Sequence, residues 1–491
     1  MKYYYRYFLI PLFLGNFFCT RVLAQEQPVE LNDTTYPVIQ TFLGNWQRNY
    51  YGVNAPEKLD IIWKHHLGTG ETVISRRLGT KIWSGAGWTG QPLLVSENDT
   101  LFLLQGAYDH HLKKINAEDG KLVWQYLFDD VIKGTGTIWV NKNPDKPENS
   151  LVILQGSRLG VGNFLDSRYI PSYRAISYFT GKELWRFDQK WTESYSRDVD
   201  GSALILNDTV YIGFENSLFT VFNPDHRNAT LINGMFQPQI YEEHKLYSLN
   251  DVYNHKNNIV TESSPSIMGN RIYVASGAGH VWGYNLISRK LDWDFFIGSD
   301  MDGSAVVTND SCIMVSVEKQ YIKGKGGVFK LNPLSAPDKS VVWFFPVENN
   351  DFNGWEGGVI GSVGINDSYI QPDKTHLSAF VGIDGYLYVV DHRSIDESMK
   401  VLGPDSLTYY FHPKLIYKEK VGPSISTPVF VENKLIVAGY WGISLYEYNE
   451  NNQFVLLDKK PGSFESTPIV YNYKIYIASR DGYLYCFGLK N

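Results

Sequence analysis

The stretch STPVFVENKLIVA, residues 426–438, decides the fold because the chain repeats it. It returns 40 residues later as STPIVYNYKIYIA, residues 466–478, with the same apolar positions. A third copy runs from Ser264 to Ala275. Each copy holds two short apolar runs joined by a tight turn, which is the pattern of a β-hairpin. Short strands that recur with a period of about 40 residues are typical of β-propeller blades.

Further copies extend the repeat along the chain. Two open at Gly201-Ser202-Ala203 and Gly303-Ser304-Ala305, and diverged copies begin close to Gly90, Gly136 and Gly357. The repeats predict eight blades, which start near residues 88, 135, 200, 262, 302, 356, 424 and 463. Asn-Asp pairs at 98–99, 207–208, 309–310 and 366–367 lie between apolar runs and predict hairpin turns, because Asn and Asp tolerate positive φ.

The last copy ends before its outer strand, and the missing strand is found at the other end of the repeat. Residues 59–64 read as an outer strand that contains Trp63, with no inner strands before it. Pairing the two segments closes the ring and removes an exposed edge. We therefore expect an all-β protein over residues 25–491, a single closed eight-bladed propeller of four-stranded blades whose N-terminal strand completes the last blade.

The first 24 residues have the features of a signal peptide. Lys2 and Arg6 supply positive charge, a short apolar run follows, and Val22-Leu23-Ala24 forms a cleavage site. We expect a secreted or periplasmic protein, or one associated with the cell surface. No later stretch is long and apolar enough for a transmembrane segment.

The composition excludes several classes of protein. The net charge is −7, and the sequence has no Lys/Arg-rich block, so we expect no nucleic-acid partner. Only 3 Cys occur, which excludes a disulfide scaffold and a Cys-rich zinc site.

Several copies close on a Gly-Lys-x-x-Trp phrase, such as NAEDGKLVW at 116–124 and YFTGKELW at 178–185. Together with GNWQRN at 44–49, these phrases resemble the pyrroloquinoline-quinone (PQQ)-like propeller repeat of quinoprotein alcohol dehydrogenases. The resemblance implies the fold and leaves the function open, because the same repeat also serves the non-enzymatic assembly subunit of the outer-membrane β-barrel machinery. In cofactor-bearing members an adjacent Cys pair lies beside the quinone, and Glu, Asn and Asp hold calcium. No two cysteines are adjacent here, so we expect no PQQ.

Acidic residues recur where the chain leads into the innermost strand of a blade. Such connections lie on one face of a propeller, together with the second hairpin of each blade. The acids that recur ahead of Gly or Ser are Asp200, Glu262, Asp302, Glu356 and Glu465. A ring of carboxylates around a channel would suit Ca²⁺, an oxygen-binding cation. In the alternative interpretation, each acid only accepts backbone N–H bonds and fixes its strand.

The same face carries candidate ligand-binding and catalytic residues. The second hairpins present the ligand-binding candidates Arg158, His280, Tyr440 and Trp441. The repeat is interrupted between 159 and 174 by an insertion rich in Arg and Tyr. His110, Tyr173, Arg174 and Arg197 are the catalytic candidates, a set that resembles the base, proton donor and carboxylate-neutralising residues of propeller polysaccharide lyases.

Three functions follow, in order of preference. The first is a secreted, non-enzymatic propeller that binds a protein partner or an extracellular glycan on its loop-rich face. The alternative is a carbohydrate-active enzyme, similar to polysaccharide lyases, on the same face. The third is a divergent PQQ-dependent dehydrogenase.

Overall fold

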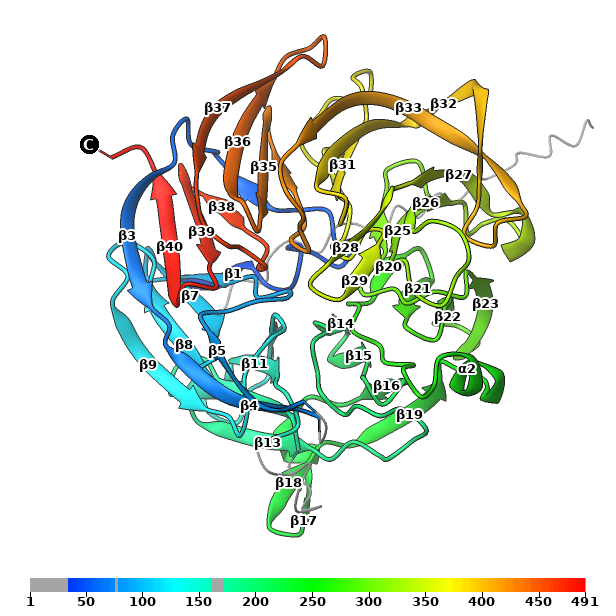
Figure 1. Ribbon diagram of the computed structural model, residues 1–491. Helices are drawn as coiled ribbons and strands as arrows, with labels where there is room; N and C mark the ends of the chain where they lie inside the picture. Colours follow the sequence, from blue (N-terminus) through cyan, green and yellow to red (C-terminus); the bar gives the residue numbers. More distant parts are fainter. Residues whose placement is uncertain (1–33, 76–77, 161–170, 491) are drawn as a thin grey trace, which may run out of the picture.

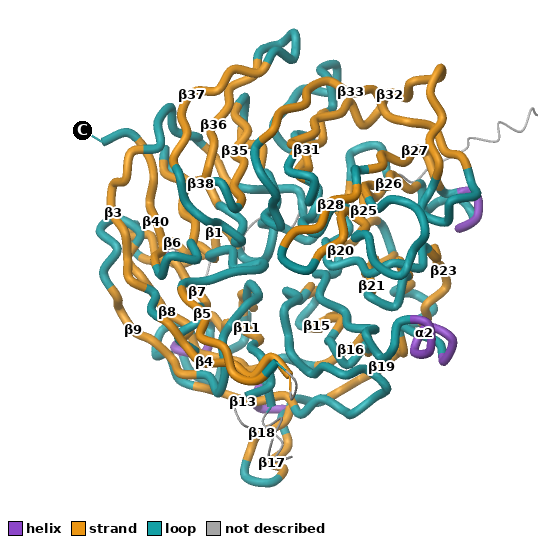
Figure 2. The backbone as a smooth tube through the Cα atoms, viewed as in Figure 1, coloured by secondary structure: helices purple, strands orange, loops and turns teal. Residues whose placement is uncertain are grey.

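Eight β-sheets stand side by side around a central axis and form a closed ring (Figure 1). The computed structural model describes residues 34–75, 78–160 and 171–490. Strands make up about half of this part of the chain, and its helices are short (Figure 2). The prediction of an all-β, eight-bladed propeller is confirmed. The expected signal peptide, residues 1–24, lies outside the described residues.

Each blade is an antiparallel sheet whose first strand is innermost. Blades 1 to 4 comprise β6 (Leu93–Glu97), β7 (Thr100–Gly106), β8 (His111–Asn116) and β9 (Leu122–Leu127); β10 (Thr137–Val140), β11 (Leu151–Gly156), β12 (Tyr173–Ser177) and β13 (Glu183–Phe187); β14 (Leu204–Leu206), β15 (Thr209–Gly213), β16 (Leu218–Phe222) and β19 (Ile240–Lys245); and β20 (Ser266–Met268), β21 (Arg271–Ser276), β22 (His280–Asn285) and β23 (Lys290–Phe296).

The second half of the ring repeats this arrangement. Blades 5 to 7 comprise β24 (Val306–Val307), β25 (Ile313–Val317), β26 (Gly327–Leu331) and β27 (Val341–Pro346); β30 (Gly364–Ile365), β31 (Leu377–Val381), β32 (Tyr386–Leu402) and β33 (Tyr409–Lys420); and β34 (Val429–Val431), β35 (Lys434–Gly439), β36 (Gly442–Tyr448) and β37 (Phe454–Lys460). Blade 8 begins with β38 (Ile469–Tyr471), β39 (Lys474–Ala478) and β40 (Tyr483–Gly488).

The N-terminal region closes the ring. β3 (Asp60–His66) is the outer strand of blade 8 and pairs antiparallel with β40, with Trp63 opposite Cys486. β1 (Thr35–Ile39) pairs with β6, and β2 (Gly52–Val53) pairs in parallel with β38. The predicted completion of the last blade by an N-terminal strand is thus confirmed.

Insertions between the strands carry the remaining elements. These are the hairpins β4 (Thr69–Ser75)–β5 (Gly79–Ser84), β17 (Thr230–Ile232)–β18 (Met235–Gln237) and β28 (Asn349–Phe352)–β29 (Trp355–Gly357), the helix α2 (Leu249–Asn254), and the 3₁₀ turns Pro147–Asn149, His226–Asn228 and Pro337–Lys339. In the described residues, no helix has the length and apolar character needed to span a bilayer.

Tryptophans on five of the outer strands join a blade to the next. Each donates its indole N–H to a backbone carbonyl of the following blade: Trp63 to Ala117, Trp124 to Tyr178, Trp185 to Pro224, Trp293 to Ser335 and Trp343 to His392, at 2.7–3.1 Å. Three of these are the tryptophans of the Gly-Lys-x-x-Trp phrases or their relics, at 124, 185 and 293. The phrase therefore recurs because it makes the contact between blades.

Trp185→Phe tests this contact. Trp185 is buried, and Phe keeps a ring in the core while it leaves the carbonyl of Pro224 without a donor. We expect the free energy of unfolding to fall by about 1–3 kcal/mol in denaturant titrations. Trp441→Phe, at a side chain that is 49% exposed, is the matched control and should change stability by less than about 0.5 kcal/mol. Equal effects of the two substitutions would contradict the role of the indole bond.

Residues 39–54 occupy the central channel and touch every blade. One hydrogen bond to each blade shows this. In blades 1 to 4 the bonds run from Leu43 N to Gln91 Oε1, from Ile138 N to Gln40 O, from Thr41 Oγ1 to Ala203 O and from Ile267 N to Trp46 O. In blades 5 to 8 they run from Val307 N to Gln47 O, from Ile365 N to the Tyr51 hydroxyl, from Asn54 N to Glu432 Oε1 and from Val470 N to Tyr51 O. Most of these partners lie on or beside the innermost strands. We call residues 39–54 the axial segment.

Only two of the four Asn-Asp pairs make the predicted turn. Asn98-Asp99 and Asn207-Asp208 have positive φ at both residues, as a two-residue hairpin turn requires. In the pairs at 309–310 and 366–367 neither residue has positive φ. There the aspartates instead bind basic side chains, Asp310 to Lys330 and Asp367 to His376.

Candidate functional site

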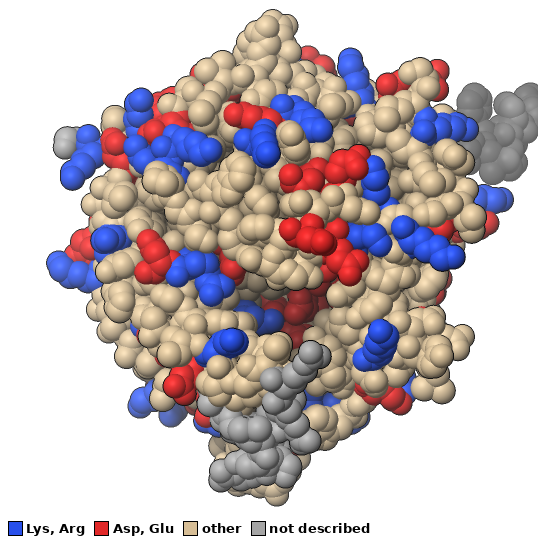
Figure 3. Space-filling view, viewed as in Figure 1, with Lys and Arg blue, Asp and Glu red and all other residues tan. Residues whose placement is uncertain are grey.

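The connections into the innermost strands and the second hairpins meet on one face of the ring. Arg158, in a second hairpin, lies 2.7 Å from Asp198, which leads into the next blade. Arg480, in the second hairpin of blade 8, lies 2.8 Å from Glu465, which leads into the same blade. Figure 3 shows that the molecule is hollowed near its centre, with Asp and Glu in the hollow. We call this region the acidic mouth; its carboxylates are Asp198, Asp200, Glu215, Glu262, Asp300, Asp302 and Glu318.

The first carboxylate cluster of the mouth is Asp200, Glu215 and Glu262, whose nearest oxygens lie within 4.8 Å of one another. Lys133 contacts Asp200 directly, and its Nζ is 3.6 Å from Glu262 Oε1. Ser196 donates a 2.5 Å hydrogen bond to Glu215. Burial raises the pKa of Asp200 to about 7 despite Lys133, and burial and Asp200 raise the pKa of Glu215 well above its usual range. One ammonium group therefore balances only part of this charge.

The second cluster is Asp300, Asp302 and Glu318, with the same 4.8 Å spacing. In the described part of the chain, no Lys, Arg or His forms an ion pair with any of the three. Burial, reinforced by neighbouring carboxylates, raises the pKa of Asp300 to about 7 and that of Glu318 to about 9. The same causes raise the pKa of Asp302 well above its usual range. This cluster therefore holds protons at neutral pH unless a cation takes their place.

Several buried oxygens of the mouth have no hydrogen-bond partner among the described residues. They are Asp200 Oδ1, Glu215 Oε1, Asp300 Oδ1 and Asn258 Oδ1. Asn258 also donates at 3.3 Å to the other oxygen of Asp300. An oxygen-only donor set of carboxylates and an amide is the chemistry that Ca²⁺ prefers. Buried polar atoms without partners are costly, so a bound cation would satisfy them.

The flanks of the mouth are already neutralised. Asp198 accepts hydrogen bonds from Arg158 and from the backbone N–H of Leu159. Burial raises the pKa of the Asp198 carboxyl, but the positive charges of Arg158 and Lys133 outweigh it and leave this pKa below its usual value. Glu465 binds Arg480 and accepts a 2.9 Å hydrogen bond from the Tyr440 hydroxyl. Of the predicted ligand-binding residues, Arg158 and Tyr440 thus lie at the mouth with their polar groups engaged by carboxylates.

His280 and Trp441, the other two ligand-binding candidates, have different surroundings. His280 stacks on Trp282 with ring centroids 4.8 Å apart, and its Nδ1 is 2.6 Å from Asp294. It is buried beside Asp251 of α2, so its ring packs inside the protein and is not exposed to a ligand. Trp441 is 49% exposed and contacts Gly422 at the start of a blade, and Lys420 Nζ lies 5.9 Å from its ring centroid.

The four catalytic candidates do not form one site. The phenol of Tyr173 is fully buried against Phe214 and Trp185 in the core of blade 2, where its hydroxyl reaches no ligand. Arg174, the next residue of β12, is buried and binds Asp129. The physical reason is that both residues belong to a core strand and not to the insertion.

The other two candidates are held by separate partners. His110 Nε2 donates a 2.8 Å hydrogen bond to the backbone carbonyl of Glu71 in the β4–β5 hairpin. Arg197 is buried and stacks on Trp191 at 4.2 Å. Residues 161–170, which include most of the predicted insertion, lie outside the described residues.

The predicted acidic ring is therefore divided. Asp200, Glu262 and Asp302 lie in the two clusters, and Glu465 pairs with Arg480 beside them. Glu356 is exposed on the β28–β29 hairpin, although it lies close enough to raise the pKa of Glu318 further. Sequence reasoning missed Glu318 and Lys133. Glu318 directly follows the apolar strand β25, a position at which a second hairpin was expected.

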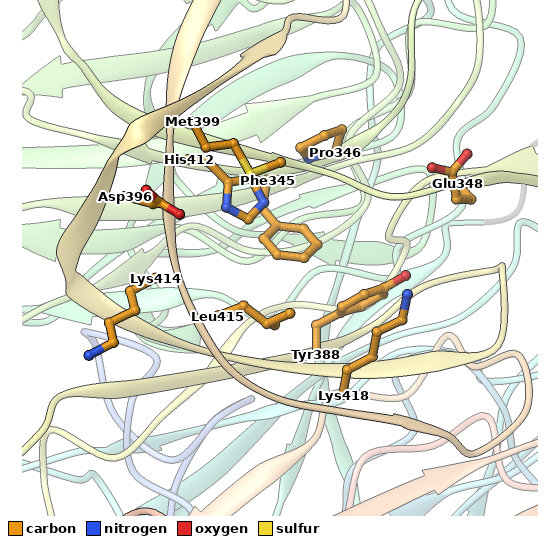
Figure 4. Close-up of a pocket in the computed structure, with 10 residues that line it drawn as sticks. All are labelled: Phe345, Pro346, Glu348, Tyr388, Asp396, Met399, His412, Lys414, Leu415 and Lys418. Carbon is orange, nitrogen blue, oxygen red and sulfur yellow. The ribbon is translucent and has the colours of Figure 1, made fainter.

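A separate pocket of about 350 Å³ lies between β27 and the β32–β33 hairpin (Figure 4). Phe345 forms its floor against His412, with ring centroids 4.6 Å apart. Met399 and Leu415 line it from the extended part of the hairpin. None of the residues predicted for a site lines this pocket.

Comparisons with known proteins agree with this architecture. The family model described as outer membrane protein assembly factor BamB matches residues 62–226. The fold also resembles solved propellers, among them a europium-containing methanol dehydrogenase, with a TM-score of 0.58, 10% identity, and coverage of 92% of this chain and 98% of that one. The protein is an eight-bladed β-propeller, and residues 62–226 resemble the BamB family of PQQ-like repeats.

Two further structures show the range of proteins with this fold. The quinohemoprotein alcohol dehydrogenase of Comamonas testosteroni has a TM-score of 0.56 at 11% identity, over 92% of this chain and 81% of that one. The BamB of Moraxella catarrhalis has a TM-score of 0.50 at 11% identity, over 88% of this chain and 98% of that one. At such identities the likeness concerns the β-propeller fold alone. No curated protein matches the sequence.

Proposed function

We propose that this PQQ-like propeller is a secreted, non-enzymatic binding protein whose acidic mouth takes up Ca²⁺ and whose loop-rich face binds an extracellular glycan or a protein partner. The observation that carries the proposal is the Asp300–Asp302–Glu318 cluster. Its carboxylates are close together, largely buried and without an ion-pair partner in the described residues. A hard divalent cation would neutralise them and bind the free oxygens of Asp300 and Asn258.

A cation in the mouth would also order the surface of the face. Asn258 donates to Asp300 and, at 3.1 Å, to the hydroxyl of Tyr321. Tyr321 is 41% exposed and stacks on His255 with ring centroids 4.3 Å apart. Binding of Ca²⁺ at Asp300 would fix Asn258 and thereby the Tyr321 ring. The Tyr321 ring and the exposed side chains of Trp441 and Tyr195 are aromatic surfaces on which a sugar or an apolar side chain would stack.

The other two functions have less support. The lyase hypothesis needs His110, Tyr173, Arg174 and Arg197 around one substrate, and Tyr173 and Arg174 are buried in blade 2. The dehydrogenase hypothesis needs a site for an anionic quinone. Lys133, Arg158 and Arg480 of the mouth are already bound to carboxylates, and Cys312 and Cys486 lie in different blades. The donor set therefore fits a hard cation and does not fit PQQ.

Calcium titration tests the proposal. We expect Ca²⁺ added to chelator-treated protein to bind in calorimetry and to raise the thermal midpoint, because it binds only the folded state. Tb³⁺ offers a second readout, since Tyr321 near the cluster should sensitise its luminescence. Asp302→Asn should weaken binding at least about tenfold, because it removes one charged ligand.

The matched control is Glu397→Gln, an exposed acid on β32 outside the mouth, which should bind Ca²⁺ as the unmodified protein does. Ca²⁺ binding that survives Asp302→Asn unchanged would overturn the site. The ligand is tested with a panel of acidic polysaccharides, with and without Ca²⁺. If Ca²⁺ binds and no glycan shifts the midpoint, the glycan alternative fails and a protein partner remains.

A further inference from the structure

Blade 6 contains a buried cluster that is separate from the mouth. Asp367 follows β30, His376 precedes β31, and His392 lies in β32. All three side chains are 5% exposed or less. One ligand atom from each lies within 4.8 Å of the others. Two imidazoles and a carboxylate are a donor set suited to Zn²⁺.

The ring nitrogens turn toward one carboxylate oxygen. Asp367 Oδ1 is 2.5 Å from His376 Nδ1 and 3.4 Å from His392 Nε2. The second distance equals the separation of about 3.4 Å between two ligands that bind tetrahedral zinc at about 2.05 Å. The first is a hydrogen-bond length, so a metal requires His376 to shift outward by about 1 Å. His392 Nε2 is buried and makes no hydrogen bond of good geometry.

The opposite nitrogen of each ring has the partner that a metal-bound histidine needs. His392 Nδ1 is 2.7 Å from the Ser378 hydroxyl, and His376 Nε2 is 3.4 Å from the carbonyl of Pro372. The Ser378 hydroxyl donates to Met314 Sδ at 3.2 Å and so can accept the proton of His392 Nδ1, which leaves Nε2 free to bind a metal. With a metal on His376 Nδ1, the proton of that ring would move to Nε2, which faces the carbonyl of Pro372. With a proton on Nδ1, the lone pair of His392 Nε2 would face the Asp367 carboxylate, an arrangement that calls for a cation between them.

The local charge balance also leaves room for a cation. The nearest ammonium group, that of Lys330, contacts Asp310 and donates to the carbonyl of His392 at 2.8 Å. These two charges cancel. Asp367 has no Lys or Arg partner among the residues that the structure describes, and the backbone N–H of Asn309 donates to its other oxygen at 2.7 Å. A buried carboxylate is costly without a counter-charge.

We propose that Asp367 Oδ1, His376 Nδ1 and His392 Nε2 form a structural site for Zn²⁺. Three protein ligands leave one tetrahedral position for a water molecule. The site would tie the loop after β30 to the start of β31 and to β32 where pairing with β33 becomes irregular, beyond Asp391. The metal thus anchors the base of the long β32–β33 extension. Ser378, His392 and Asp367 also line up as in a hydrolase, but all three are fully buried and no substrate reaches them.

Metal analysis of the purified full chain tests this site. We expect about one zinc per chain after dialysis against metal-free buffer, and a lower thermal midpoint after removal with a strong zinc chelator, restored by Zn²⁺ alone. His392→Gln should lower the zinc content at least tenfold. The matched control is His255→Gln, another buried histidine, whose Nδ1 binds the carbonyl of Gly277 at 2.6 Å. It should keep its zinc.

A spectroscopic measurement covers the case in which His392→Gln does not fold. Co²⁺ loaded into the unmodified chain should give visible absorption bands of a tetrahedral site with nitrogen and oxygen ligands, and Zn²⁺ should abolish them. Asp302→Asn should leave the zinc content unchanged, which separates this site from the mouth. Less than about 0.1 metal per chain, with no midpoint shift on addition of Zn²⁺ and no Co²⁺ bands, would overturn the proposal.

Discussion

Arg48→Met is expected to lower the free energy of unfolding by about 4 kcal/mol, because it removes the polar centre of the axial segment. Arg48 is fully buried, and its guanidinium donates to Thr41 Oγ1 at 2.7 Å, to Phe42 O at 2.8 Å and to Pro265 O at 2.7 Å and 2.9 Å. A further bond reaches Ala203 O at 3.2 Å. One side chain therefore joins the axial segment to blades 3 and 4.

The size of the effect follows from the kind of partner. The acceptors are backbone carbonyls and a hydroxyl, and burial lowers the pKa of Arg48 to about 9. Met fills similar space but leaves several buried carbonyls without donors, each of which costs about 1–3 kcal/mol. Denaturant unfolding followed by tryptophan fluorescence measures the change. Arg48→Lys, which keeps the charge and loses the planar fork, should be intermediate. A loss below about 1 kcal/mol for Arg48→Met would show that the axial segment does not hold the ring together.

The second large effect is a fall in stability as pH rises from 7 to 9 in protein stripped of divalent cations. The folded-state pKa is raised to about 9 for Glu318 and well above the usual range for Asp302 and Glu215, whereas the same carboxyls are ionised at pH 7 in the unfolded chain. The folded state thus binds more protons, and its advantage is lost as pH rises through these pKa values. Each retained proton contributes a slope of about 1.4 kcal/mol per pH unit.

The other buried groups do not produce this fall. Arg48, whose pKa burial lowers to about 9, acts in the opposite direction and only near the upper end of the window. The histidines His255, His392 and His412 have pKa values lowered by burial and are neutral throughout it, and Asp198 and Asp367 titrate far below it. Thermal midpoints at pH 7, 8 and 9 measure the slope, and saturating Ca²⁺ should flatten it because the metal replaces the protons. Glu318→Gln should reduce the slope in metal-free protein. A midpoint that rises from pH 7 to 9 without Ca²⁺ would contradict the raised pKa values.

The β-propeller fold could be predicted from the sequence because residues that make the same contacts recur from blade to blade. Trp124, Trp185 and Trp293 recur since each spans the gap to a neighbour, and Asp200, Glu262 and Asp302 recur since each leads into an inner strand at the mouth. Such positions are local in the repeat, so a period of about 40 residues is enough to find them.

The parts that were missed depend on register and on contacts between blades. Tyr173 and Arg174 read as the end of an insertion, but they are the first residues of β12, and strand alternation buries Tyr173 against Phe214. Glu318 was missed because a one-residue difference in a strand end decides which side chain enters the mouth. Asp367, His376 and His392 belong to a blade whose pairing is irregular, so no spacing in the sequence brings them together.

The pairing of β3 with β40 fixes the order in which the molecule can be completed. Because a protein is synthesised from its N-terminus, the edge of β3 stays unpaired and exposed until β40 has been made. Folding should therefore pass through a late and slow ring-closing step, during which helper proteins and proteases have access to the open form. Once the ring is closed, neither β3 nor β40 can detach without breaking the hydrogen bonds that pair the two strands. The finished ring should open rarely, and its lifetime in a protease-rich environment should be set by that one event.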